Sequence, residues 1–292
     1  MVVDESKLKF YMLMRRTYDI FKDVQVNRMG TVSRERGLPF AVGEGLYSDR
    51  LEDIEKDLTK KLDIQLKAVP LYQQWLDGVK GIGPRLAAAW ISYIQVTYKT
   101  LEELNIKEEE LTEVQKTFSV KTKGDKMRYP TIRGIGAFAT ISKLWKWCGI
   151  GVEDGEAPRR EHGKKLGSHP KMAALAWMTG QQFRLLKGKD SYYEQLYVKY
   201  KEELYAGQYG KAVEDPTQCK RYIPCKERLG KAATRLGRDP KKFPCKKHVD
   251  NMAMRKAVKE FIKDLWINWR KIEGLPLTGT YEEDVLGHKH GP

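Results

Sequence analysis

Apolar residues spaced three or four positions apart constrain the fold of this chain more than any other feature of its sequence. Over residues 47–66 such residues line one face and Glu, Asp and Lys fill the other; the apolar members are Leu51, Ile54, Leu58, Leu62 and Leu66. A helix gathers these positions on one side, whereas a half-buried strand needs strict alternation. Stretches that alternate are few, so we predict a mainly α fold.

Helical signals of this kind recur along the whole chain and set the expected elements. The first 80 residues are expected to be helical around a loop, and the C-terminal half is expected to alternate helices with long Gly/Pro loops. A proline near a helix start and a glycine after its end support the boundaries. The expected elements are a loop at 37–45, short surface helices within 99–117, a loop or strand pair at 120–131, helices at 170–186 (capped by Ser168), 191–205 and 249–273, and a stop at Gly274 and Pro276.

Composition excludes two classes of protein. Apolar residues make up 41% of the chain and aromatic residues 10%, which is enough to fill a core, so disorder is excluded as the main state. No stretch approaches the roughly 18 to 20 apolar residues of a membrane helix, and the first residues lack the layout of a signal peptide. We therefore predict a soluble, intracellular protein with no membrane partner.

The positive charge is concentrated in the C-terminal part of the chain. Residues 1–118 hold 18 basic and 19 acidic residues, whereas residues 119–292 hold 36 basic and 20 acidic residues, a net of +16. The basic residues interleave with aromatic ones and form no simple tail. Such asymmetry favours a polyanionic partner, most often nucleic acid, although a basic protein without such a partner is the alternative.

A glycine-rich turn between two helices gives this partner a contact. Residues 78–94 read GVKGIGPRLAAAWISYI, in which Gly81-Ile82-Gly83 forms a tight turn and Pro84 opens an Ala-rich helix. This is the pattern of a helix-hairpin-helix. Glycine permits positive φ and lets the backbone approach a phosphate, and the N–H groups of the loop and of the helix N-terminus face one anion. Lys80 and Arg85 add charge, and we expect Ile82 to point inward. A plain helix-turn-helix corner is the alternative.

A second segment repeats the pattern. Ile132-Arg-Gly-Ile-Gly136 matches Val79-Lys-Gly-Ile-Gly83. It is either a second hairpin, which would give a tandem pair that straddles a duplex, or a helix start of unrelated origin. As a hairpin, it would add Arg133, Gly134 and Gly136 to the DNA contacts.

The order of these motifs resembles that of a known family. GIGPRLAAAWISYI is followed by FATISKLWKWCGIG at 138–151, by GKKLGSHPKMAALAWMTGQQFRLL at 163–186, and by a Tyr-rich helix that ends in K-x-x-x-Tyr. Over about residues 78–205 this order is similar to the C-terminal domain of the Piv/MooV-type DNA invertases and insertion-sequence transposases. The resemblance implies a DNA-binding domain in which Lys80, Gly81, Gly83 and Arg85 make the hairpin contacts.

The family's catalytic features have no counterpart in the sequence. The family's RuvC-like domain supplies four metal-binding acids from an α/β fold, whereas residues 1–77 look helical. Its nucleophilic serine follows the Gly-rich turn, but the matching stretch, residues 151–161, contains no serine. The resemblance thus implies DNA handling without evident catalytic residues.

Three cysteines and a histidine form a candidate metal site. Cys219, Cys225, Cys245 and His248 have the spacing Cys-x5-Cys-x19-Cys-x2-His, and four such ligands suit a tetrahedral structural zinc ion. A Cys219–Cys225 disulfide and coincidence are the alternatives. The fourth cysteine, Cys148, is expected to be a small buried apolar residue.

Two charged segments surround these motifs. Residues 211–248 hold 12 basic and 4 acidic residues, so a zinc-stapled basic loop would make a second DNA contact, with a solvated basic loop as the alternative. The acids of residues 153–161 could bind Mg²⁺ only if they converged, and surface charge explains them equally.

Together these features predict a cytoplasmic, nucleoid-associated protein that binds double-stranded or branched DNA, with self-association as a further expectation. The expected parts are a helical scaffold at 1–77, a helix-hairpin-helix domain at 78–205, and a zinc module with a long helix at 206–292. The alternatives are a transposase, recombinase or structure-specific nuclease, and an RNA-binding or scaffold protein. The predicted DNA contacts are Lys80, Gly81, Ile82, Gly83, Arg85, Arg133, Gly134, Gly136, Lys164, Lys165, Lys226, Arg228, Arg235 and Arg238.

Overall fold

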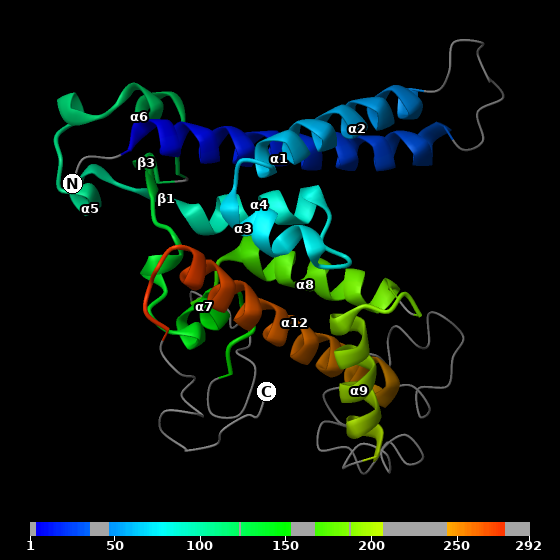
Figure 1. Ribbon diagram of the computed structural model, residues 1–292. Helices are drawn as coiled ribbons and strands as arrows, with labels where there is room; N and C mark the ends of the chain where they lie inside the picture. The colour runs from blue at the N-terminus through cyan, green and yellow to red at the C-terminus, as the bar shows by residue number, and fades with distance from the viewer. Residues whose placement is uncertain are drawn as a thin grey trace. The chain divides into compact units, whose positions relative to one another are not determined.

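A computed structural model describes the chain as mainly helical with one small antiparallel sheet (Figure 1), which confirms the mainly α prediction. The described residues are 4–35, 47–122, 124–152, 167–186, 188–206 and 244–277. They fall into two compact units, Met1–Thr140 with Trp266–Pro292, and Ile141–Leu265. The boundary predicted after residue 77 lies inside the first unit.

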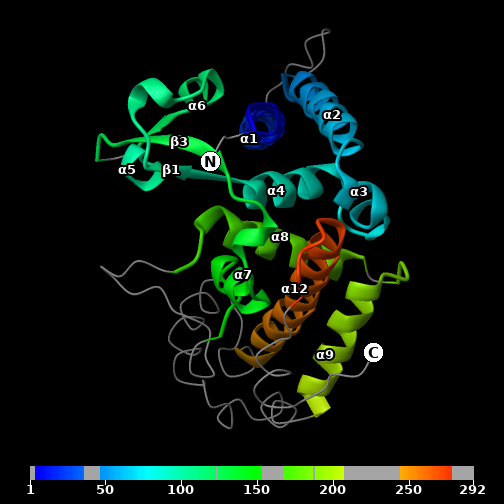
Figure 2. The ribbon, with the colours of Figure 1, turned by 60° about the vertical axis from the view of Figure 1, so that its left-hand side comes forward.

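Two long helices, α1 (Glu5–Glu35) and α2 (Tyr47–Leu66), form an antiparallel pair in the first unit (Figures 1 and 2). The Arg28 guanidinium donates to Glu55 across the pair, with Nε 2.6 Å from Oε1. The apolar stripe of α2 is confirmed at Leu58, Leu62 and Leu66, which are buried. Ile54, however, is 46% exposed, whereas its neighbour Glu55 is buried. Glu55 is buried because its carboxylate forms an ion pair with Arg28 of α1.

A short helix α3 (Pro70–Gln74) and a 3-10 turn (Leu76–Gly78) lead to α4 (Pro84–Gln95), which packs against α1 and α2. Every residue of α4 from Ala87 to Gln95 is buried. The three consecutive alanines, Ala87 to Ala89, have side chains small enough for the long helices to approach this helix closely. The hairpin loop is therefore attached to the core of the unit.

The sheet of the first unit has the strand order β1-β3-β2 and is antiparallel. β1 (Val96–Lys99) continues directly from α4, and its Val96 pairs with Ile132 of β3 (Met127–Ile132). The strand pair expected at 120–131 is confirmed as β2 (Val120–Lys121) and β3, and β1 is an addition to the prediction.

The acid-rich segment forms short helices, as expected. α5 (Leu101–Leu104) and α6 (Glu113–Thr117) each begin with a capping box, in which Thr100 pairs with Glu103 and Thr112 pairs with Gln115. The reciprocal hydrogen bonds satisfy N–H groups that a helix start leaves without partners. The side chains of this segment therefore stabilise its own helix N-termini.

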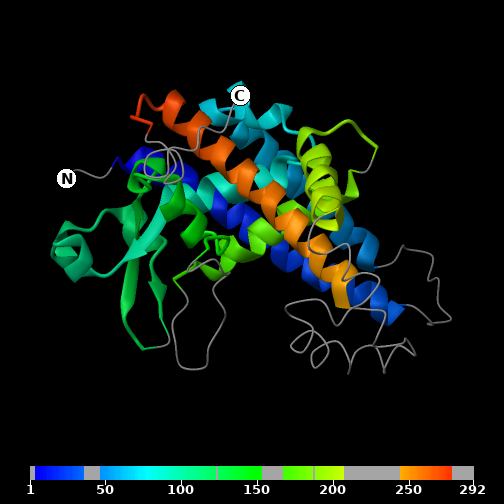
Figure 3. The same cartoon turned by 90° about the horizontal axis from the view of Figure 1, so that it is seen from below.

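The second unit is built from α7 (Ile141–Trp147), α8 (Pro170–Leu185), α9 (Tyr192–Ala206) and the part of α12 (Pro244–Ile272) that ends at Leu265. α9 lies beside α12 (Figure 3). The rings of Phe183, Tyr193 and Phe261 stack and meet edge-on at centroid distances of 4.8 to 5.6 Å. Gly180 allows α12 to approach, since a Cβ there would lie 2.6 Å from Met254 Cγ.

The helix boundaries in the C-terminal half agree with those predicted from the sequence, except for the cap of α8. Gly274, at φ +66°, ends α12 as expected, and Leu275 N donates to Arg270 O at 2.8 Å. Ser168 is not the cap of α8. His169 is the N-cap, without a side-chain hydrogen bond, because Pro170 occupies the first helical position and makes the residue before it the cap. Cys148 is a buried free thiol, as predicted.

No described helix is long and apolar enough to cross a membrane.

Candidate nucleic-acid interface

The loop between α3 and α4 has the backbone geometry that the glycine pattern predicts (Figure 2). Gly81 has φ +95°, a conformation that a residue with a Cβ rarely adopts. Ile82 N donates to Val79 O at 3.0 Å and closes the turn. The Ile82 side chain is 3% exposed, which confirms that it points inward. Gly83, at φ −78° and ψ 175°, is the N-cap of α4 and is exposed.

The N-terminus of α4 is the positive end of the helix dipole. No side-chain hydrogen bond caps it, and its first turn contains no acidic residue. Lys80 and Arg85 are both exposed beside it. A helix N-terminus carries roughly half a positive charge and normally attracts acids. α5 and α6 in the same unit follow that rule, with acidic side chains in their first turns, whereas α4 does not.

Arg85 is held on the face of α4 that looks toward α1. Its guanidinium lies 5.1 Å from the centre of the Phe21 ring, a cation–π contact. This contact orients the side chain while it leaves the charge at the surface.

A shallow hollow of about 500 Å³ lies next to Arg85, where residues of α1, α2 and α4 meet; it is lined by Arg28, Glu52, Glu55, Lys56, Thr59, Lys60 and Arg85. Each of its acids has a basic partner within the hollow. Glu55 pairs with Arg28 at 2.6 Å, and Glu52 pairs with Lys56 at 3.2 Å. Among the described residues, Lys60 and Arg85 take part in no ion pair. The hollow is therefore positive through these two side chains.

Lys22 adds a further cation close to Arg85. Burial, and then the Arg85 guanidinium, lower the pKa of this lysine below its usual range. Lys22 Nζ donates to Gln25 Oε1 at 2.6 Å on the same helix. The positive charges are thus crowded, which weakens proton binding at the most buried of them.

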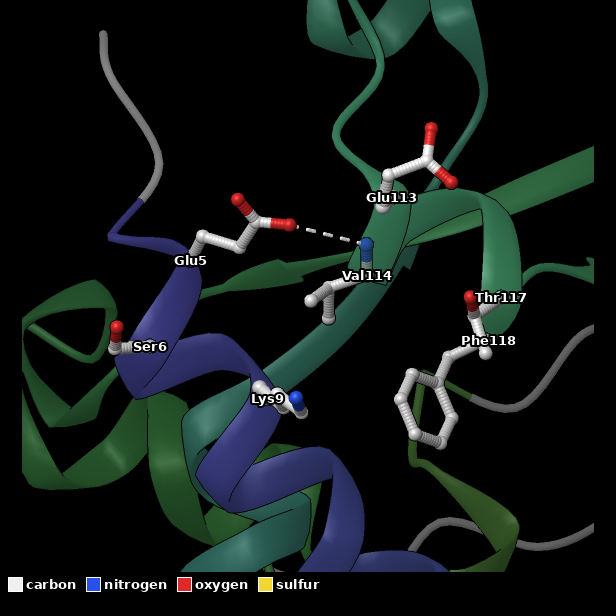
Figure 4. A pocket seen from close by; sticks show the side chains of 7 residues that line it. All are labelled: Glu5, Ser6, Lys9, Glu113, Val114, Thr117 and Phe118. Carbon is white, nitrogen blue, oxygen red and sulfur yellow. Dashed lines mark hydrogen bonds between the residues drawn. The ribbon is translucent and has the colours of Figure 1, made fainter.

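A hollow of similar size at the other end of α1 has the opposite charge (Figure 4). It measures about 480 Å³ and is lined by Glu5, Ser6, Lys9, Glu113, Val114, Thr117 and Phe118. The Glu5 carboxylate accepts a hydrogen bond from Val114 N at 3.2 Å. A side chain of α1 thus binds an N–H group in the first turn of α6. Two acids against one lysine make this hollow a poor phosphate site.

The second Gly-Ile-Gly segment is not a second hairpin, so the tandem prediction is wrong. Strand β3 leads into it, and the 3-10 turn η3 (Ile135–Ala137) follows it. The segment lies at the C-terminus of α4, because β3 pairs with β1, which continues from that helix. Arg133 N donates to Gln95 O at 2.7 Å. The structure is closer to the other alternative, a helix start of unrelated origin, although the segment begins a short 3-10 turn and not an α-helix.

Arg133 uses its side chain inside the protein. Its guanidinium donates to Tyr93 O at 2.7 Å and to Ile94 O at 3.2 Å, and it lies 4.9 Å from the centre of the Phe138 ring. Carbonyls at a helix C-terminus lack intrahelical donors and attract cations. Arg133 therefore has a structural role, and the DNA contact that the repeated pattern suggested for it stays a prediction.

The two glycines of this segment differ in what they require. Gly134 has φ +69° and ψ 174°, a region open almost only to glycine. A Cβ at Gly136 would meet Leu275 Cδ1 at 3.5 Å, an ordinary contact. Gly134 therefore serves the turn after β3, and Gly136 is not required by the backbone.

The other predicted site residues fall outside what the structure describes. Lys164, Lys165, Lys226, Arg228, Arg235, Arg238, Cys219 and Cys225 lie in segments that are not described. The backbone of Cys245 and His248 begins α12, but their side chains are not described. Within the described part of the chain, no three His, Cys, Asp or Glu side chains gather as a group that could hold a metal ion.

Sequence reasoning missed the basic residues of the hollow. Arg28, Lys56 and Lys60, which line the hollow, lie in a region that was predicted to be a scaffold with a near-neutral total charge. The same is true of Lys22, which lies close to Arg85. The near-neutral total charge concealed a local excess of positive charge, because ion pairs such as Lys56–Glu52 and Lys61–Asp57 use the acids of α2 and leave Lys60 outside them. The charges become a cluster only when α1, α2 and α4 pack.

Comparison with protein-family models, with curated proteins and with solved structures finds no match to this chain. The resemblance to the invertases and transposases therefore remains a prediction from the sequence.

Proposed function

We propose that this protein binds the phosphate backbone of duplex DNA through the loop and helix start at residues 80–85. The N–H groups at the N-terminus of α4 and the side chains of Lys80 and Arg85 bind one phosphate. Gly83 gives that phosphate access because it places no Cβ at the entrance. Such a contact positions a protein on DNA without reading its sequence.

One observation carries this proposal. The N-terminus of α4 combines an exposed glycine N-cap, no side-chain cap and no acid in its first turn with two exposed cations. A fold that needed only stability gains about 0.5 to 1 kcal/mol from an acid or a Ser/Thr/Asp cap at such a place. The Arg85 guanidinium and the positive end of the helix repel each other until an anion binds between them, and a backbone phosphate is an anion that a helix N-terminus binds well.

The basic segment 211–248 belongs to the same proposal as a second contact. Cys219, Cys225, Cys245 and His248 would hold it with a structural zinc ion, and its lysines and arginines would neutralise further phosphates. Unlike the hairpin, this part rests on the sequence alone.

The sharpest test is Gly83→Asp, because the proposal predicts that this substitution stabilises the fold while it weakens DNA binding. Gly83 has N-cap geometry, and a Cβ there meets no atom within 4 Å. An aspartate should therefore cap α4 and raise the free energy of unfolding by about 0.5 to 1 kcal/mol. If the site binds phosphate, the same carboxylate occupies and repels it, and the affinity for duplex DNA should fall about tenfold or more. Urea denaturation and fluorescence anisotropy with a labelled duplex measure the two effects.

Gly124→Asp is the matched control. Gly124 lies in the turn between β2 and β3, and a Cβ there also meets no atom within 4 Å. Gly124→Asp makes the same change in net charge as Gly83→Asp but lies away from the hairpin, so the affinity for DNA should change little. Equal losses for both variants would reduce the effect to net charge, and full binding by Gly83→Asp would end the proposal. A duplex RNA competitor that displaces DNA at lower concentration would favour RNA as the partner.

A further inference from the structure

The hollow beside the hairpin, formed by α1, α2 and α4, contains a cation, Lys60, that the single phosphate contact does not use. We infer that this hollow binds a second phosphate of the same DNA backbone, with Lys60 as its own cation and Arg85 shared with the first phosphate. This inference rests on the proposed function, since the first phosphate at the N-terminus of α4 places the DNA next to the hollow.

The charges of the hollow make it an anion site and not a neutral surface. Arg28 neutralises Glu55 at 2.6 Å, and Lys56 neutralises Glu52 at 3.2 Å. These pairs occupy the walls, and within the described chain neither Lys60 nor Arg85 has an acidic partner. A second phosphate would therefore meet Lys60, whose charge no carboxylate of the described chain offsets, and would share Arg85 with the first phosphate.

The position of Arg85 links the hollow to the hairpin. Arg85 follows Pro84 in the first turn of α4, and it also lines the hollow. Its contact with the Phe21 ring fixes the guanidinium between the two places. A DNA strand whose phosphate sits on the loop would thus continue past Arg85 toward Lys60, which α2 supplies.

The crowding of Lys22 and Arg85 is consistent with an anion between the helices. The pKa of Lys22 is lowered by burial and then by the neighbouring guanidinium. A phosphate in the hollow would relieve this repulsion. The volume of about 500 Å³ and the open, shallow form of the hollow suit a backbone phosphate and its sugar.

The test compares two neighbouring lysines of α2. Lys60 lines the hollow, whereas Lys61 pairs with Asp57 at 2.8 Å and does not line it. Lys60→Gln and Lys61→Gln change the net charge equally and keep similar helix propensity. For the full-length protein, the logarithm of duplex affinity is measured against the logarithm of salt concentration. Lys60→Gln should lower the slope by about 0.9 and weaken binding about fivefold, and Lys61→Gln should match wild type.

Each outcome separates this inference from the function on which it rests. If Gly83→Asp loses DNA binding but Lys60→Gln behaves like Lys61→Gln, the hairpin contact stands and the second phosphate is wrong. If wild type binds no duplex, the proposed function fails and takes this inference with it. If inorganic phosphate shifts the Arg85 Nε signal in NMR spectra and Lys60→Gln leaves the DNA salt slope unchanged, the hollow is a small-anion site, which also overturns the inference.

Discussion

The two Gly-Ile-Gly segments carry nearly the same five residues, yet they lie at opposite ends of one helix. Val79-Lys-Gly-Ile-Gly83 precedes the N-terminus of α4, and Ile132-Arg-Gly-Ile-Gly136 lies against its C-terminus. The first leaves its cations exposed at the positive end of the helix dipole. The second turns its arginine onto the carbonyls of the negative end, where a cation stabilises the fold.

The difference arises from what precedes each segment. A short helix and a 3-10 turn lead into the first, so its loop joins two helices. A strand leads into the second, and its pairing with β1 carries Arg133 to the helix end. The same local pattern thus serves an open site in one place and a closed structural contact in the other. A glycine motif predicts a tight turn, and its surroundings decide what the turn faces.

The largest expected effect breaks the closed end. Arg133→Ala removes charged hydrogen bonds to Tyr93 O and Ile94 O and the contact with the Phe138 ring. Because the buried carbonyls then lose their donors, we expect the free energy of unfolding to fall by about 3 kcal/mol. Urea denaturation measures the loss. Under conditions where the variant is folded, its affinity for duplex DNA should equal that of wild type.

Arg85→Ala is the reciprocal control at the open end. It should change the free energy of unfolding by no more than about 0.5 kcal/mol, the value of an exposed cation–π contact, while it weakens DNA binding. Arg133→Lys adds a second control, since it keeps the charge but not the planar fork. The contrast between the two ends is refuted if Arg133→Ala is as stable as Arg85→Ala.

A smaller loss is expected from Gly134→Ala, which tests the backbone of the closed end. At φ +69° and ψ 174° a Cβ is strained whatever the space around it, so the substitution should cost about 2 kcal/mol in unfolding free energy. Gly136→Ala places a Cβ at an ordinary 3.5 Å from Leu275 Cδ1 and should cost less than about 0.5 kcal/mol. Thermal unfolding of both variants compares the two losses of stability, and equal melting temperatures would contradict the argument from backbone conformation.

The sequence predicts the helices well because their apolar spacing is local. It places α2, α9 and the end of α12 within a few residues, and it predicts the buried Ile82 and the positive-φ glycine of the hairpin. It does not predict that Glu55 is buried and Ile54 exposed, since an ion pair with another helix determines this.

The candidate site is predictable only in part for the same physical reason. The loop at Gly81 to Gly83 is encoded in consecutive residues, so the sequence identifies it. The hollow takes Arg28 from α1, Lys60 from α2 and Arg85 from α4, residues that meet only after the helices pack. The structural role of Arg133 likewise depends on strand pairing, which the repeated pattern does not show.

The smallest expected effect sharpens the comparison through the charge of one lysine. Arg85 is among the causes that lower the pKa of Lys22, after burial, so Arg85→Gln should raise that pKa and Arg133→Gln should leave it unchanged. NMR titration of the Lys22 side chain measures both. A folded-state pKa below the unfolded value of 10.5 means that the folded protein binds fewer protons, so stability rises with pH up to about 10.5. This rise should be smaller in Arg85→Gln, because its Lys22 is closer to the unfolded value. If the two variants move the pKa of Lys22 equally, the positive charge is not local to the N-terminus of α4, and the electrostatic contrast between the two ends of the helix fails.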